Sequence, residues 1–141
     1  MKALGLNGRE YTWNLSKYDV YENDKRKRSK PHLRARGILK EIYGGGYRIL
    51  EEVKLPGSTL PHRKSVLYLD FFIPIIRVGI EVHGKQHYEF TPFFHNTKAA
   101  FLKAQTRDED KLNWCELNDI ELIILKHSDG DDVWRKQIKR C

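Results

Sequence analysis

The chain has 141 residues, of which 40% are hydrophobic and 32% charged, and a net charge of +7. This length and composition favour one soluble globular domain. No apolar run approaches the roughly 20 residues that cross a bilayer or resembles the core of a signal peptide. The two cysteines, Cys115 and Cys141, are too few for a disulfide framework or a cysteine-type zinc site, which favours a reducing, cytoplasmic setting.

The excess positive charge lies at the N-terminal end. Residues 1–40 contain 11 Lys and Arg against 4 Asp and Glu, whereas residues 41–141 contain 15 of each. A basic segment beside a neutral body is typical of proteins that contact the phosphate backbone of nucleic acids. A solvated tail or a localisation signal is the alternative. We therefore expect a basic, aromatic N-terminal arm over residues 1–28, followed by one domain over residues 29–141.

Four aromatic residues lie in the expected arm without a regular period: Tyr11, Trp13, Tyr18 and Tyr21. Exposed aromatic side chains beside a basic run can stack on bases or wedge into a duplex. They can equally pack this segment onto the body, and the mixed pattern slightly favours that alternative.

Beyond the arm, hydrophobic periodicity predicts the order helix, three strands, helix, strand, helix. Ser29 and Pro31 give a start signal for the first helix, and three consecutive glycines end it. The predicted helices cover residues 32–43, 99–117 and 134–140, and the predicted strands cover residues 47–55, 66–73, 76–83 and 120–125.

The second helix carries charged residues on its apolar side. Its stripe at spacings of three and four runs through Phe101, Ala104, Asp108, Lys111 or Leu112, and Cys115. Charges that face a sheet are costly unless they are paired or functional. Asp108 and Lys111 therefore form either a salt bridge at the edge of the core or part of a site.

The two middle strands form a predicted hairpin that carries two acids. Pro74 ends the first strand because proline cannot donate to a ladder. With the turn centred near residues 75–76, Asp70 falls opposite Glu81, and His83 shares the face of Glu81. Opposed carboxylates repel each other, and a divalent cation between them would relieve that cost. The alternative is that both acids face water.

A loop with histidines follows the hairpin. His83 and His87 lie four residues apart beside the paired acids, which favours a functional role because histidine titrates near neutrality. Lys85 and Lys111 could contact a phosphate as point charges, although solvated lysines are the ordinary case. A structural zinc site built from His83, His87 and His95 is a third interpretation, and it lacks cysteine ligands.

Taken in order, LDFFIP, IEVHGKQHY, RDEDKLNWC and IELIIL resemble the PD-(D/E)XK superfamily of restriction-endonuclease-like nucleases, in its very-short-patch-repair and phage homing-type branch. The resemblance covers roughly Ser29–Leu125. It implies a restriction-endonuclease-like core, with a mixed central sheet of about four strands flanked by helices in the order αβββαβ. The sequence departs from the pattern at His83, where Lys or Asp is usual, and in the first helix, whose only glutamate is the late Glu41.

The resemblance implies an endonuclease that hydrolyses phosphodiester bonds of double-stranded DNA with Mg²⁺, for which Mn²⁺ could substitute. It implies that Asp70, Glu81 and Val82 hold the metal, that His87 acts as base or leaving-group partner, and that Asp108 orients His87. With His83 these side chains form the expected catalytic set: Asp70, Glu81, His83, His87 and Asp108. The residues expected to contact DNA are Lys25, Arg26, Lys27, Arg28, Lys30, Arg34, Arg36, Lys85, Gln86 and Lys111.

Two further expectations concern partners. The small size leaves little surface for reading a long DNA site, which favours modest specificity, a partner protein or a homodimer. The expected setting is the cytoplasm of a bacterial or phage-infected cell, without a membrane. The runner-up interpretation is a non-catalytic nucleic-acid-binding module that retains the nuclease fold, and the departure at His83 is its motivation.

Overall fold

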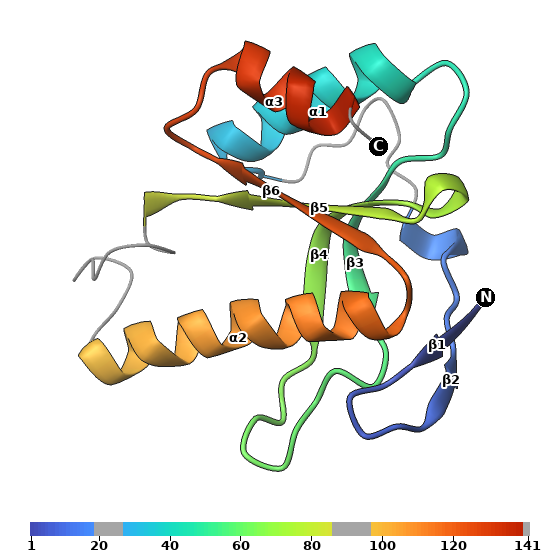
Figure 1. Cartoon of the computed structure of the whole chain (residues 1–141), viewed down its shortest axis with the longest axis vertical. Coiled ribbons are helices and arrows are strands. Elements are labelled where there is room, and N and C mark those ends of the chain that lie inside the picture. The colour runs from blue at the N-terminus through green and yellow to red at the C-terminus, as the bar shows by residue number, and fades with distance from the viewer. Residues whose placement is uncertain (19–26, 86–96, 140–141) are drawn as a thin grey trace.

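The computed structural model describes residues 1–18, 27–85 and 97–139. In these residues a four-stranded mixed sheet lies between helices, and a small two-stranded sheet stands beside it (Figure 1). The α-helices are α1 (Lys30–Tyr43), α2 (Lys98–Leu117) and α3 (Asp131–Lys139), and the strands are β1 (Lys2–Leu4), β2 (Glu10–Thr12), β3 (Leu50–Leu55), β4 (Leu67–Ile73), β5 (Val78–His83) and β6 (Glu121–Lys126). The predicted order of elements from α1 to α3 is confirmed.

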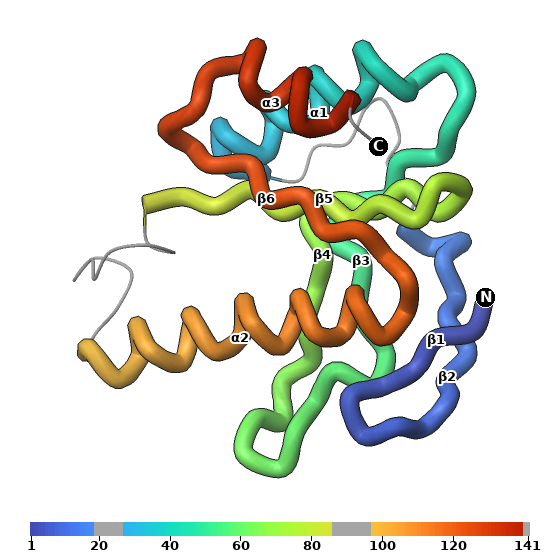
Figure 2. Tube along the Cα trace, in the orientation of Figure 1, coloured from blue at the N-terminus to red at the C-terminus, as the bar shows by residue number. Residues whose placement is uncertain are grey.

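The central sheet has the strand order β3-β4-β5-β6. Its first two pairings are antiparallel, and β5 pairs with β6 in parallel through the crossover helix α2. Helices α1 and α3 cover one face and α2 covers the other, as the trace in Figure 2 also shows. A mixed α/β architecture of about four strands was predicted, and the sheet confirms it. Among the described helices, none is both long and apolar enough to cross a lipid bilayer.

Local sequence signals fix the ends of these elements. The Ser29 hydroxyl accepts a hydrogen bond from the His32 amide (3.2 Å), and Thr97 caps α2 in the same way through the Ala100 amide (3.1 Å). Helix α3 begins earlier than predicted, at Asp131, because acidic residues suit the positive end of a helix. Strand β3 begins later than predicted, at Leu50, because the turn after the glycines extends further.

The first 18 residues share the core of the body. The Trp13 ring is buried, stacks on Phe72 with centroids 4.9 Å apart, and meets Trp114 edge-on at 5.0 Å. Its Nε1 donates a hydrogen bond to the Lys54 carbonyl (2.9 Å). The expected arm over residues 1–28 therefore does not stand apart over residues 1–18, because an aromatic side chain anchors this hairpin in the core. Tyr21 lies outside the described residues.

The side-chain alternation of β3 and β4 changes at one level of the sheet. Leu50 and Val53 both belong to the core on the α2 side although they are three residues apart, and Leu69 and Phe72 repeat this pattern on β4. Between them Glu52 adopts a positive φ of 50°. The residue pairs Glu51–Phe71 and Val53–Leu69 of β3 and β4 share one register, and no regular pair is formed between them. The irregular position is therefore that of Glu52 and Asp70. The sheet thus deviates from regular pleating where the sequence predicted a site.

Candidate functional site

Strands β4 and β5 separate at Asp70 and Glu81. Regular pairing runs from Ile73 and Val78 to Phe71 and Ile80, so the next level is that of the two acids, as predicted. At that level, hydrogen bonds from backbone amides to the two acidic side chains take the place of the backbone–backbone hydrogen bonds of the sheet. The Asp70 amide donates to Glu81 Oε2 (2.9 Å), and the Val82 amide donates to Asp70 Oδ2 (2.8 Å). Glu81 is only 2% exposed, so the alternative in which both acids face water is wrong.

The two carboxyl groups perturb each other. Burial, followed by the charge of Glu81, raises the pKa of Asp70 from 3.8 to about 7. Near neutrality the pair therefore carries less than its full negative charge. A cation between the carboxyl groups would stabilise the ionised form of both, because it replaces repulsion by attraction.

Helix α2 delivers one cation to this pair. Lys111 Nζ donates a hydrogen bond to Glu81 Oε1, and its side chain is 16% exposed. Burial alone would lower the pKa of Lys111, but the contact with Glu81, aided by Asp70 and Asp108, raises it instead, so the amine stays protonated. Of the two candidates for the stripe, Lys111 faces the sheet and Leu112 is exposed.

Asp108 lies one helical turn before Lys111 and acts on it electrostatically. The structure thus brings Asp108 to the edge of the cluster formed by Asp70, Glu81 and Lys111. The predicted pairing of Asp108 with His87 falls outside the described residues, as do Gln86 and His95.

His83 is buried at the end of β5. Ile80 and Val82 pack into the core on the α1 and α3 side, so strand alternation directs His83 to the face of Glu81, as predicted. The Val82 side chain belongs to that opposite core, and only its main chain lies at the acids.

The donor set suits a hard cation that keeps some of its water. The described part of the chain contains no group of three or more His, Cys, Asp or Glu side chains that could hold a metal ion. Mg²⁺ is commonly held by one or two carboxylates together with water and substrate phosphates. Asp70 and Glu81 fit that requirement, whereas a closed zinc site needs more protein ligands.

Of the ten residues expected to contact DNA, Lys111 contacts Glu81 and the other nine divide into three groups. Lys25, Arg26 and Gln86 lie outside the described residues, and Lys27, Lys30 and Lys85 are exposed. Arg28, Arg34 and Arg36 are bound within the fold. Arg28 contacts Glu52. Arg34 contacts Asp131, and its guanidinium carbon lies 3.7 Å from the centroid of the Trp134 ring. Arg36 donates a hydrogen bond from Nε to Glu51 Oε2 (2.8 Å). Their guanidinium groups neutralise acids of neighbouring elements, which was not predicted.

A buried polar cluster behind Asp70 was also missed. His32 Nε2 lies 2.6 Å from Glu51 Oε1, and Arg36 Nη2 donates to the same oxygen at 2.9 Å. Burial would raise the pKa of Glu51, but His32 and Arg36 outweigh it and lower that pKa. The His32 ring stacks on Phe71, the neighbour of Asp70, with centroids 4.5 Å apart. The cluster therefore ties α1 to the two strands at the level of the site.

Comparison with known proteins gives viral relatives. No family model and no solved structure matches the chain. The chain is 40% identical over 79 residues to the uncharacterized protein 307L of Invertebrate iridescent virus 6, which is 56% of this chain and 40% of that protein. It is 47% identical over 62 residues to the uncharacterized protein 033L of Invertebrate iridescent virus 3, covering 44% and 32% respectively. It is 31% identical over 90 residues to the uncharacterized protein 094L of Frog virus 3, covering 60% and 58%. The chain thus spans less than two thirds of the length of each relative.

Proposed function

We propose that this protein is a metal-dependent nuclease that hydrolyses phosphodiester bonds of DNA on a restriction-endonuclease-like core. The observation that carries the proposal is the pair of carboxyl groups on Asp70 and Glu81, set where β4 and β5 separate and contacted by Lys111. The order of α1, the three strands, α2 and β6 supports it, because the resemblance implies the same order. The viral relatives make a virus-infected cell the proposed setting.

Phosphodiester hydrolysis needs an activated water and compensation for the charge that builds on the phosphate. Asp70 and Glu81 would hold Mg²⁺ or Mn²⁺, which supplies charge stabilisation and a more acidic water when bound. The Asp70 and Val82 amides keep the two carboxyl groups oriented, since each donates to one of their oxygens. This orientation is fixed by the backbone of the sheet, before any substrate arrives.

Lys111 would contribute the second positive charge. An ammonium group has three donors, so Nζ can hold Glu81 and still donate to a phosphate oxygen. His83 occupies the strand position where the nuclease pattern has Lys or Asp, and Lys111 offers an ammonium group from α2 instead. His83 can hold or release a proton on the same face, because imidazole titrates near neutrality. His87 remains the proposed general base or leaving-group partner, with Asp108 as the residue that orients it.

Cleavage of supercoiled plasmid tests the proposal. The wild-type protein should nick or cut the plasmid in Mg²⁺ and not in EDTA. Asp70→Asn and Glu81→Gln should lose more than about a hundredfold in rate, which is the order of effect when a charged catalytic group is removed. Glu116→Gln, an exposed acid on the same helix as Lys111, is the charge-matched control and should keep the wild-type rate. Equal cleavage by all variants would refute the assignment of the site.

A second candidate function is a nucleic-acid-binding module without catalysis. It is favoured by the contact of Lys111 with Glu81, which places an ammonium group on an oxygen that a metal would use. Salt-sensitive DNA binding without cleavage in Mg²⁺ or Mn²⁺ would select this alternative.

A further inference from the structure

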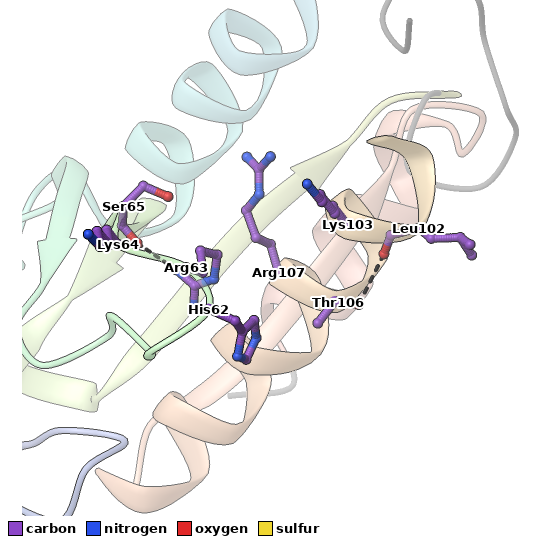
Figure 3. A pocket seen from close by; sticks show the side chains of 8 residues that line it. All are labelled: His62, Arg63, Lys64, Ser65, Leu102, Lys103, Thr106 and Arg107. Carbon is purple, nitrogen blue, oxygen red and sulfur yellow. Dashed lines mark hydrogen bonds between the residues drawn. The ribbon is translucent and has the colours of Figure 1, made fainter. Parts of the chain in front are cut away.

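A basic cleft lies between the β3–β4 connection and the N-terminal half of α2 (Figure 3). Its volume is about 540 Å³. The side chains that line it are those of His62, Arg63, Lys64, Ser65, Leu102, Lys103, Thr106 and Arg107, and none of them is acidic. Basic residues of the β3–β4 loop and of helix α2 thus line the same cleft.

One wall of the cleft is held in place by Arg63. Its guanidinium donates hydrogen bonds to the Ser58 carbonyl (2.8 Å), the Ser65 carbonyl (2.6 Å) and the Asp110 carboxylate (3.2 Å). The bond to Asp110 links the loop to α2. The loop wall is therefore positioned by the contacts of the Arg63 side chain together with the backbone bridge between Leu60 and Arg63.

The remaining cations that line the cleft are exposed. Lys64, Lys103 and Arg107 form no hydrogen bond or ion pair through their side chains with any residue in the described ranges. In Figure 3 the Arg107 and Lys103 side chains extend from α2 on the side of the loop. Cations that line one cleft with no acid among its lining residues repel each other, and an anionic ligand would relieve that repulsion.

These cations lead to the candidate site. Lys103, Arg107 and Lys111 follow one another at intervals of four residues, so they lie along one side of α2 with a rise of about 6 Å per step. The last of them contacts Glu81. A chain of phosphates that enters the cleft would therefore be directed toward the paired acids.

We propose that this cleft binds the phosphodiester backbone of the DNA strand that reaches Asp70 and Glu81. The inference rests on the proposed function for one point only, that the ligand is a nucleic acid. The cleft has the volume of a small-molecule site, so it takes a short stretch of one strand. None of its lining residues is a Phe, Tyr or Trp on which bases could stack. Binding is thus to phosphates, which makes it strongly salt-dependent and weakly dependent on sequence.

Fluorescence anisotropy with a labelled DNA duplex of arbitrary sequence tests the cleft, in EDTA so that binding is measured apart from cleavage. The test variant combines Lys64→Gln, Lys103→Gln and Arg107→Gln. The control combines Lys40→Gln, Lys136→Gln and Lys139→Gln, which removes the same charge from exposed positions on α1 and α3. An RNA duplex of the same sequence serves as the second probe. Thermal unfolding of all proteins verifies that they are folded.

The cleft variant should lose more than about tenfold in DNA affinity near 0.1 M salt, and its salt slope should fall by about 3, close to one for each phosphate contact removed. The control variant should change far less in both quantities. This result supports the cleft even if the wild-type protein cleaves nothing in Mg²⁺, so the two proposals can fail separately. Equal losses in both variants, no DNA binding by the wild type, or a cleft-specific loss confined to RNA would each overturn the inference.

Discussion

Asp70 illustrates how a buried carboxyl group makes the stability of the fold depend on pH. Its carboxyl group is held against Glu81, and burial together with that charge raises its pKa to about 7. Between the ordinary pKa of 3.8 and about 7 the folded state binds more protons than the unfolded state, so the free energy of unfolding falls as the pH rises through this window.

The variant Asp70→Asn should therefore be more stable than the wild type at about pH 8, by about 2 kcal/mol. The amide oxygen can still accept from the Val82 amide, while the charge that opposes Glu81 is gone. The difference should vanish below about pH 4, where Asp70 is protonated in both states. Denaturant unfolding across this pH range measures it. A variant that is less stable than the wild type at about pH 8 would show that Asp70 is a structural ion.

Lys111 and Glu81 should depend on each other. Lys111→Met leaves the buried Glu81 without its cation and should cost about 3 kcal/mol of unfolding free energy, whereas Glu81→Gln in the same protein should recover part of that loss. A double-mutant cycle by denaturant unfolding measures the coupling. Lys103→Met, at an exposed position of the same helix, is the control and should change stability by less than about 0.5 kcal/mol. Additive effects would mean that the contact contributes nothing to folding.

Residue-level prediction from sequence succeeded where a short-range rule applied. The position of Pro74 and the alternation of the hairpin were enough to set Asp70 opposite Glu81. The partner of Lys111 could not be derived in this way, because Lys111 and Glu81 are thirty residues apart and belong to different elements. The cluster of His32, Glu51 and Arg36 was missed for the same reason.

At the scale of elements, the N-terminal hairpin is docked by two glycines. Leu6 donates its amide to the Gly57 carbonyl (2.8 Å), and Gly57 has a φ of 70°. A Cβ atom on Gly57 would lie 2.5 Å from the Gly5 Cα and 2.4 Å from the Tyr11 ring. The hairpin formed by β1 and β2 can therefore approach the β3–β4 connection only because neither glycine has a side chain.

Gly57→Ala should destabilise the protein by about 2 kcal/mol or more, because it combines a positive φ with a steric clash. Gly45→Ala is the matched control, since a Cβ atom there meets nothing within 4 Å and its φ is not positive. Thermal unfolding compares the two variants. A Gly57→Ala protein with wild-type stability would indicate that the hairpin is not docked on the body in solution.

The elements themselves followed from periodicity, except at this hairpin. Helix α2 was predicted almost to the residue, because its stripe at spacings of three and four is long. Strands β1 and β2 have three residues each, which is too short for a pattern. What anchors them is Trp13, just after β2, whose ring meets Trp114 of α2 edge-on.

For the whole molecule, linear charge counting located the basic surface only in part. The excess charge of residues 1–40 predicted the contact region there. Yet Arg28, Arg34 and Arg36 bind acids of the fold. The basic cleft instead comes from residues 62–107, which lie within the segment 41–141 whose overall charge count is neutral. Charge becomes a surface property only after folding has paired some ions and left others exposed.

The central claim is that Asp70 and Glu81 together hold a divalent cation, and calorimetric titration of Mn²⁺ into the full chain at about pH 8 tests it most directly. At that pH Asp70 is ionised, so both carboxylates are available. The wild type and the control Glu116→Gln should show the same saturable binding, and Asp70→Asn and Glu81→Gln should lose it. If the wild type and Asp70→Asn give the same Mn²⁺ titration curve, whether or not binding saturates, the account is contradicted.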